Sequence, residues 1–190
     1  DAGIALTKDQ CEKIIVDGTA VAEVPLVTGS NVENSSYKQS VIGTLFYESN
    51  EWLFHHLGSM ARRVNDQNWN FDLTGSYEGM DIITYTAPAG SMGWHTDLFA
   101  GDLSLGEDTG MAARKLNMIV QLSDPNNYQG GELQLFVPSL GNNEDRTIYT
   151  APRDQGKLII FPAYIYHHVM PVTEGKRSSL VTYCHGKQFV

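Results

Sequence analysis

Short segments rich in β-branched and aromatic residues alternate with polar turns through the second half of the chain. Nine such segments predict strands, at residues 71–73, 81–86, 94–98, 116–122, 132–137, 146–150, 157–161, 166–170 and 178–184. No helical pattern separates them, and many of the 18 glycines and 7 prolines fall in the turns. Many short strands with polar turns are typical of a barrel or jelly roll that can enclose a small ligand. We therefore expect a mainly β fold.

The first seventy residues instead predict two helices. Thr7 and Gln10 form a capping-box pattern ahead of apolar residues that recur at helical spacing until Gly18. Ser49 or Asn50 caps a second helix. Its apolar stripe consists of Leu53, Leu57, Met60, Ala61 and Val64. Both helices are expected to lie against the sheet and support it.

Three further segments predict an edge strand and two loops. Residues 21–27 are β-branched but include Pro25, which confines such a strand to a sheet edge. Residues 29–40 are polar and read as a loop. Residues 98–114 are rich in glycine and acidic side chains, and loops of this length are usually either functional or disordered. This last loop is a candidate lid.

Length, composition and charge bound the function. A chain of 190 residues with 42% hydrophobic residues suits one domain with its own core. The net charge of −9 opposes binding to phosphate backbones, so nucleic acid is not expected as a partner. No apolar run is long enough to span a bilayer, so we expect a soluble, cytoplasmic protein with no membrane contact. We also expect a monomer. Cys11 and Cys184 leave a disulfide open.

Candidate metal ligands lie in the segment around residue 95 and near residue 167. His95 and Asp97 are two residues apart, so on a strand both side chains point to the same face. If His167 joins them from another strand, the set is two histidines and one carboxylate. That set is typical of non-haem Fe(II) sites that keep open positions for other ligands. A chance His-x-Asp pair is the alternative.

An arginine and a serine follow these candidate metal ligands in the sequence. Arg177 and Ser179 also lie two residues apart and would share one strand face. A guanidinium beside a hydroxyl can bind a carboxylate through two or more hydrogen bonds.

Together these motifs resemble a known family. Three motifs are similar to those of the prolyl 4-hydroxylase superfamily of Fe(II)- and 2-oxoglutarate-dependent dioxygenases. They are His95-x-Asp97, the segment from Leu-Ser-Asp-Pro at residues 122–125 to Gly130-Gly131, and the run from His167 to Arg177 and Ser179. The central motif resembles its bacterial and phage branch. The resemblance implies a double-stranded β-helix, with residues 71–190 as the jelly-roll core and residues 1–70 as helical support and substrate loop of a single domain.

The resemblance also implies roles for particular residues. The metal ligands would be His95, Asp97 and His167, with His168 projecting to the opposite strand face. Tyr85, Arg177 and Ser179 would bind 2-oxoglutarate, although Tyr85 could be a core residue.

Substrate-binding residues are implied less directly. Tyr37 and Lys38 lie where a flexible loop would fold over a peptide, and Arg114 lies where an arginine would approach it; a solvated loop arginine is the alternative. Asn117 could line the cosubstrate pocket or bond to the backbone. Tyr183 stands where plant-type members have tryptophan.

The resemblance predicts hydroxylation of a prolyl residue, at C4, in a peptide or protein. Fe(II), 2-oxoglutarate, O2 and ascorbate would be the cofactors and cosubstrates, and succinate and CO2 the co-products. The same chemistry on a free amino acid, another protein side chain or a nucleobase remains an alternative. A more remote alternative is a non-catalytic jelly-roll binding module.

Overall fold

A computed structural model describes residues 3–21, 40–88, 90–98, 113–137 and 147–187. The helices and strands follow the chain as α1 (Lys8–Ala20), β1 (Val41–Leu45), α2 (Tyr47–Asn68), β2 (Leu73–Gly75), β3 (Met80–Thr86), β4 (Met92–His95), β5 (Ala113–Gln121), a 3-10 turn (Pro125–Asn127), β6 (Tyr128–Gly130), β7 (Leu133–Val137), β8 (Thr147–Thr150), β9 (Leu158–Pro162), β10 (His167–Val169) and β11 (Val172–Gly186). Three predicted features lie mostly or wholly outside these ranges: the edge strand at 21–27, the polar loop at 29–40 and the candidate lid at 98–114.

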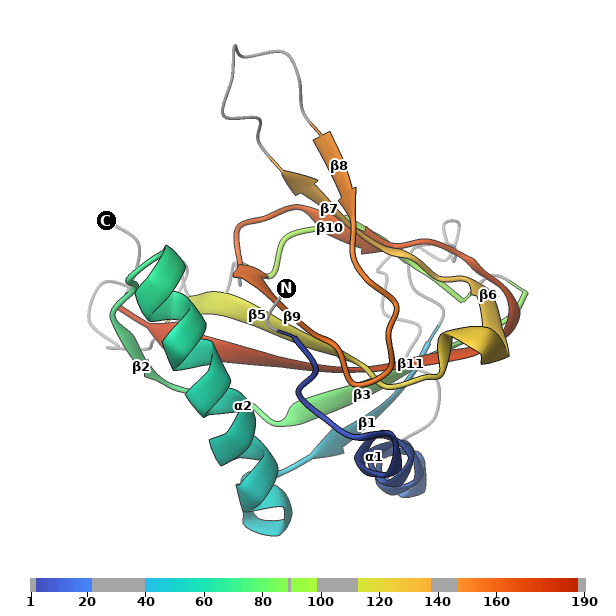
Figure 1. Cartoon of the computed structure of the whole chain (residues 1–190), viewed down its shortest axis with the longest axis horizontal. Helices are drawn as coiled ribbons and strands as arrows, with labels where there is room; N and C mark the ends of the chain where they lie inside the picture. Colours follow the sequence, from blue (N-terminus) through green and yellow to red (C-terminus); the bar gives the residue numbers. More distant parts are fainter. Residues whose placement is uncertain (1–2, 22–39, 89, 99–112, 138–146, 188–190) are drawn as a thin grey trace, which may run out of the picture.

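Two antiparallel sheets face each other, and the helices cover the outside of the larger one (Figure 1). The larger sheet has the order β1-β3-β11-β5-β9, with β2 and β6 also pairing with β11. The smaller sheet has the order β4-β10-β7-β8. This arrangement confirms the predicted mainly β fold with supporting N-terminal helices.

The first helix forms as its capping box predicts. Thr7 Oγ1 accepts from the Gln10 amide, and Gln10 Oε1 accepts from the Thr7 amide at 2.8 Å. The helix runs two residues past Gly18, which had been predicted to end it. Gly18 instead allows close packing, because a Cβ there would lie 2.7 Å from the Cβ of Ile82 on β3.

The second helix begins at Tyr47, earlier than the predicted cap. Asn50 has non-helical angles (φ −137°, ψ 25°), and its side-chain amide donates to the Phe46 carbonyl. The buried residues of this helix include the predicted stripe members Leu53, Leu57, Met60 and Ala61.

Strand alternation divides the apolar residues into two cores. One lies between the helices and the larger sheet, where Ile14, Leu57, Ile82 and Leu180 meet. The other lies between the sheets and includes Tyr85 and its neighbours. Residues on β3, β5 and β11 therefore point alternately toward the helices and into the space between the sheets.

Some predicted boundaries were wrong. β1 and β6 were not expected, and β11 is longer than the predicted strand. Arg114 lies in β5, not in a solvated loop.

Cys11 and Cys184 are buried free thiols, so no disulfide links them. No helix in the described ranges is long and apolar enough to cross a membrane.

Candidate active site

The three expected metal ligands meet between the sheets. His95 ends β4, and His167 begins β10 directly opposite it in the strand pairing. Asp97 follows β4 outside the strand, where its amide donates to the Ala163 carbonyl at 3.0 Å. One ligand atom from each of the three residues lies within 4.8 Å of the others. Asp97 Oδ1 is 3.7 Å from His95 Nε2, and its Oδ2 is 3.3 Å from His167 Nε2.

Backbone carbonyls fix how both imidazoles face this point. His95 Nδ1 lies 2.8 Å from the Gly93 carbonyl, and His167 Nδ1 lies 3.1 Å from the Ile165 carbonyl. Because a carbonyl only accepts, each Nδ1 carries a hydrogen, and Nε2 is the nitrogen whose lone pair a metal ion can use when the ring is neutral. Two nitrogen acceptors and a carboxylate then converge. A divalent cation stabilises such an arrangement, and the donor set suits Fe(II).

Asp97 is held ionised and oriented. Burial alone would raise the pKa of this carboxyl, but His167, His95 and Arg114 outweigh burial and lower its pKa. Asn117 Nδ2 donates to Asp97 Oδ2 at 2.5 Å. Asn117 is fully buried on β5, so the open question about its role is answered by contact with the carboxylate.

His168 points away from the three expected ligands, toward the opposite face of the smaller sheet. Its ring stacks on Trp94 with centroids 3.8 Å apart. Its Nε2 lies 2.8 Å from Gln134 Oε1. The structure thus brings His167, and not its neighbour, to His95 and Asp97.

The three expected ligands share an inner cavity of about 120 Å³ with the residues expected to bind 2-oxoglutarate. Tyr85, Arg177 and Ser179 line it, with Tyr183 nearer Asp97 and Arg114. Burial raises the pKa of Tyr85 to about 12, which keeps its hydroxyl protonated. Ile119, Leu133 and Val169 add apolar side chains to the cavity wall.

Arg177 is a buried cation with neutral partners. Its side chain is 1% exposed. Nη2 donates to Gln121 Oε1 at 2.8 Å, Nη1 lies 3.4 Å from Ser179 Oγ, and Tyr128 adds a side-chain hydrogen bond. No carboxylate joins these partners in the part of the chain that the structure describes, and Nε has no partner there. A guanidinium in this setting favours an incoming anion.

The two adjacent glycines of the central motif leave room for this arrangement. Gly130 and Gly131 both have positive φ, at 71° and 68°. A Cβ on Gly130 would lie 2.2 Å from the Pro171 carbonyl oxygen, and one on Gly131 would lie 2.9 Å from Arg177 Cδ. The pair therefore lets the turn close tightly on β11 and on the Arg177 side chain.

Arg114 borders the site through an ion pair. Its guanidinium donates to Glu78, with Nε 2.6 Å from Oε1, and lies 3.7 Å above the ring centre of Tyr183. Glu78 also lies 2.8 Å from His185 Nε2. Burial would raise the pKa of Glu78, but hydrogen bonds with His185 and Arg114 bring it down to about 2. Tyr37 and Lys38, the other expected substrate residues, lie outside the described ranges.

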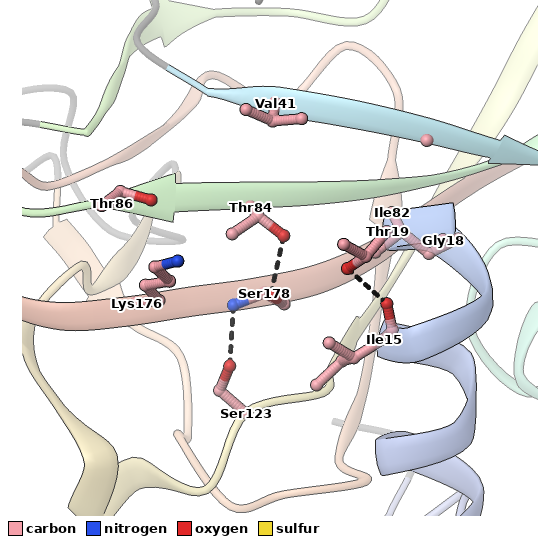
Figure 2. A pocket seen from close by; sticks show the side chains of 11 residues that line it. Ile15, Gly18, Thr19, Val41, Ile82, Thr84, Thr86, Ser123, Lys176 and Ser178 are labelled. Atoms are coloured by element: carbon pink, nitrogen blue, oxygen red, sulfur yellow. Dashed lines mark hydrogen bonds between the residues drawn. The ribbon is translucent and has the colours of Figure 1, made fainter. Parts of the chain in front are cut away.

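A second cavity, of about 390 Å³, lies on the helix side of the larger sheet (Figure 2). Its hydroxyl groups mostly bond within the protein. Thr84 Oγ1 and Ser178 Oγ are 2.8 Å apart, and Ser123 Oγ accepts from the Ser178 amide at 2.7 Å. Among the described residues, Lys176 is the one cation that lines it, and no metal-ligand set converges there. The smaller inner cavity is therefore the better candidate for chemistry.

Sequence reasoning missed Gln121 and gave Asn117 little weight. Both are on β5 at positions that point between the sheets, along with Ile119. Residues 117, 119 and 121 alternate along the strand with apolar residues 116, 118 and 120, which indicates that Asn117 and Gln121 share one face with Ile119. This pattern does not reveal which charged groups the two amides contact.

Comparisons with known proteins agree with this geometry. A family model described as "2OG-Fe(II) oxygenase superfamily" matches residues 80–185. A PKHD-type hydroxylase of Sphingopyxis alaskensis is 32% identical over 102 residues, which are 54% of this chain and 42% of that relative. The matched stretch thus spans less than half of the relative.

Solved structures with the same fold include three prolyl hydroxylases. A Pseudomonas putida prolyl-4-hydroxylase superposes with a TM-score of 0.69 at 15% identity, covering 98% of this chain and 91% of that one. The viral collagen prolyl hydroxylase of Paramecium Bursaria Chlorella virus-1, in its 2OG complex, gives 0.67 at 14% identity, covering 97% and 93%. A Trichoplax adhaerens prolyl hydroxylase, in complex with a hypoxia inducible factor peptide fragment, gives 0.64 at 14% identity, covering 94% and 76%. At these identities the likeness shows the fold, and it confirms the predicted jelly roll.

Proposed function

Because the chain belongs to the 2OG-Fe(II) oxygenase superfamily, we propose that it is an Fe(II)- and 2-oxoglutarate-dependent dioxygenase that hydroxylates a prolyl residue in a peptide or protein. The observation that carries this proposal is that one inner cavity contains both the expected metal ligands and the cation expected to bind the cosubstrate. His95, Asp97 and His167 converge at one end, and the buried, uncompensated Arg177 lies at the other.

Iron would be held by His95 Nε2, His167 Nε2 and an oxygen of Asp97. When bound there, iron supplies the activation of O2 that couples oxidative decarboxylation of 2-oxoglutarate to C–H hydroxylation, with succinate and CO2 as co-products. The chain's own contribution is orientation. The carbonyls of Gly93 and Ile165 hold the two rings, and Asn117 holds the carboxylate.

Arg177 would bind the distal carboxylate of 2-oxoglutarate. Burying a cation without a counter-charge costs several kcal/mol, so a dianionic cosubstrate would gain much of its binding free energy here. Ser179 can donate its hydroxyl to the same carboxylate, and Tyr85 can donate its phenol because its raised pKa keeps the proton in place. Apolar wall residues such as Ile119 and Leu133 would lower the local dielectric, which strengthens these contacts.

Prolyl residues are the proposed target for two reasons. The solved structures above are of prolyl hydroxylases, and one of them is in complex with a peptide fragment. In addition, Glu78 already pairs with Arg114 at the side of the site near Tyr183. That pairing leaves Arg114 poorly suited to binding the carboxylate of a free amino acid, whereas a peptide needs no such anchor.

The test is a peptide screen with a mass readout. Protein, Fe(II), 2-oxoglutarate and ascorbate, the last as the proposed reductant, are incubated in air with a library of proline-containing peptides. We expect a mass gain of one oxygen atom on a prolyl residue, and loss of the product in Asp97→Ala. If only free proline, a non-prolyl side chain or a methylated oligonucleotide is modified, the prolyl assignment is wrong.

A further inference from the structure

Gln121 contacts Arg177 from the end of β5, and its side chain has a single possible orientation. Its Nε2 donates to the Pro152 carbonyl at 3.0 Å. Because that carbonyl can only accept, the other end of the amide, Oε1, faces Arg177 Nη2 at 2.8 Å. Gln121 is 2% exposed, so water does not compete for either contact.

The backbone of Gln121 is fixed as well. Its amide donates to the Lys157 carbonyl at 2.9 Å, and its carbonyl accepts from Gly156 at 2.7 Å. Both ends of the residue are therefore anchored, and its Oε1 is a preformed acceptor for the guanidinium.

Neutrality is the feature that matters at this position. The nearby Arg153 has a carboxylate, with Nη1 3.4 Å from Glu132 Oε1. Arg177 has an amide oxygen where a carboxylate would fit. An amide orients a guanidinium through one hydrogen bond but leaves its charge uncompensated, whereas a glutamate would form a closed internal ion pair.

We propose that Gln121 is a positioning residue that holds the Arg177 guanidinium toward the distal carboxylate of the cosubstrate without neutralising it. Gln121 would thereby set the preference for 2-oxo acids with a second carboxylate. This inference rests on the proposed function, because it assumes that 2-oxoglutarate occupies the inner cavity.

The experiment compares two ligands and three variants. 2-Oxoglutarate and 2-oxobutanoate share the 2-oxo acid group, but only the first has a distal carboxylate. Dissociation constants are measured by calorimetry on protein loaded with Mn(II), and Mn(II) affinity is measured separately. The variants are Gln121→Glu, Gln121→Met and the control Gln67→Glu, an exposed residue of α2 that undergoes the same charge change.

Gln121→Glu is expected to weaken 2-oxoglutarate binding by about tenfold or more, because its carboxylate competes for Arg177. Binding of 2-oxobutanoate should change by less than about threefold, since that ligand does not need the guanidinium. Gln121→Met, which keeps the charge of Arg177 free but loses the orienting hydrogen bond, should weaken 2-oxoglutarate binding by about three- to tenfold. Mn(II) affinity should be unchanged, and Gln67→Glu should match the wild type throughout.

The outcomes separate this inference from the function beneath it. A wild-type protein that binds Mn(II) but not 2-oxoglutarate overturns both. Wild-type binding that Gln121→Glu leaves intact overturns the positioning role alone. An equal loss for both ligands also overturns it, because that is the result of general structural damage. If Gln121→Glu does not fold, Gln121→Met decides: loss of selectivity supports the role, and unchanged selectivity contradicts it.

Discussion

Neighbouring histidines at residues 167 and 168 have opposite environments, and this difference can be tested directly. His167 lies at the three-residue site, whereas His168 stacks on Trp94 outside the smaller sheet. We expect His167→Ala to weaken Co(II) binding by more than about 100-fold, since losing even an outer partner of a metal ligand costs ~10–100-fold. His168→Ala, the matched control, should retain wild-type affinity in the same absorbance titration. Equal losses in both variants would contradict the assignment.

Asn117 gives the second residue-scale prediction. Its amide is the hydrogen-bond donor that orients Asp97 from β5. Asn117→Ala removes this donor and should weaken Co(II) binding by about tenfold, as expected for a residue that holds a ligand in place. Circular dichroism checks that the variant is folded. A folded variant with unchanged metal affinity would show that Asp97 is oriented without Asn117.

Elements far apart in sequence meet at Glu78, which lies before β3 and contacts β5 and β11 through Arg114 and His185. The pKa of Glu78 is lowered from 4.5 to about 2 in the folded chain. Its stabilising contribution is thus full above about pH 4.5 and is lost as pH falls toward about 2. Because Glu78 is partly exposed, we expect Glu78→Gln to cost about 1 kcal/mol at pH 7.

The measurement is urea unfolding of Glu78→Gln and wild type across this pH range. The difference in unfolding free energy should shrink as pH falls below about 4.5. A difference that stays constant down to the lowest pH at which both proteins fold would contradict the ion-pair account.

The turn before β7 carries another element-scale prediction. Gly131→Ala places a methyl group 2.9 Å from Arg177 Cδ at a residue with φ +68°. It should destabilise the fold by about 1 kcal/mol or more and also weaken 2-oxoglutarate binding. Gly58→Ala is the control, because a Cβ there meets nothing within 4 Å and helix propensity favours alanine by about 1 kcal/mol. Thermal unfolding and calorimetry measure the two effects, and wild-type cosubstrate affinity in Gly131→Ala would contradict the contact.

Local patterns predicted the elements whose causes are local. The capping box of α1 and the β-branched segments of β3 and β5 were found because the signal lies within a few residues. β1 was missed because Gly43 interrupts its pattern. That glycine is needed for a distant reason, since a Cβ there would lie 1.9 Å from the Gly18 carbonyl oxygen.

Side-chain partners across the sheets could not be read in the same way. The spacing of His95, Asp97 and His167 indicated a metal site because the family motif restricts those positions. Strand alternation was the wrong reason for the His95–Asp97 pair, since β4 ends at His95 and Asp97 lies beyond it. Nothing local in the sequence pairs Arg114 with Glu78, or Arg177 with Gln121. These contacts depend on strand register, which becomes known only when the sheets are assembled.

At the scale of the whole molecule, the two sheets supply different residues to the candidate site. The outer face of the larger sheet packs on α1 and α2, and its inner face lies opposite the smaller sheet (Figure 1). Residues of both sheets line the inner cavity. The larger sheet supplies Arg177, Ser179 and Asn117, and β4 and β10 of the smaller sheet supply the two histidines. The proposed chemistry therefore requires both sheets to be correctly assembled, because no single segment contains all the residues of the site.

Conversion of 2-oxoglutarate to succinate, followed by proton NMR in air with Fe(II), tests this account most directly. Wild type, Asp97→Ala and Arg177→Gln are compared at low and saturating 2-oxoglutarate. We predict turnover by the wild type and none by Asp97→Ala. Arg177→Gln should have a raised KM for 2-oxoglutarate, with activity partly restored at high concentration. A folded, iron-loaded wild type that leaves 2-oxoglutarate unchanged, or an Asp97→Ala variant with wild-type turnover, would contradict the account.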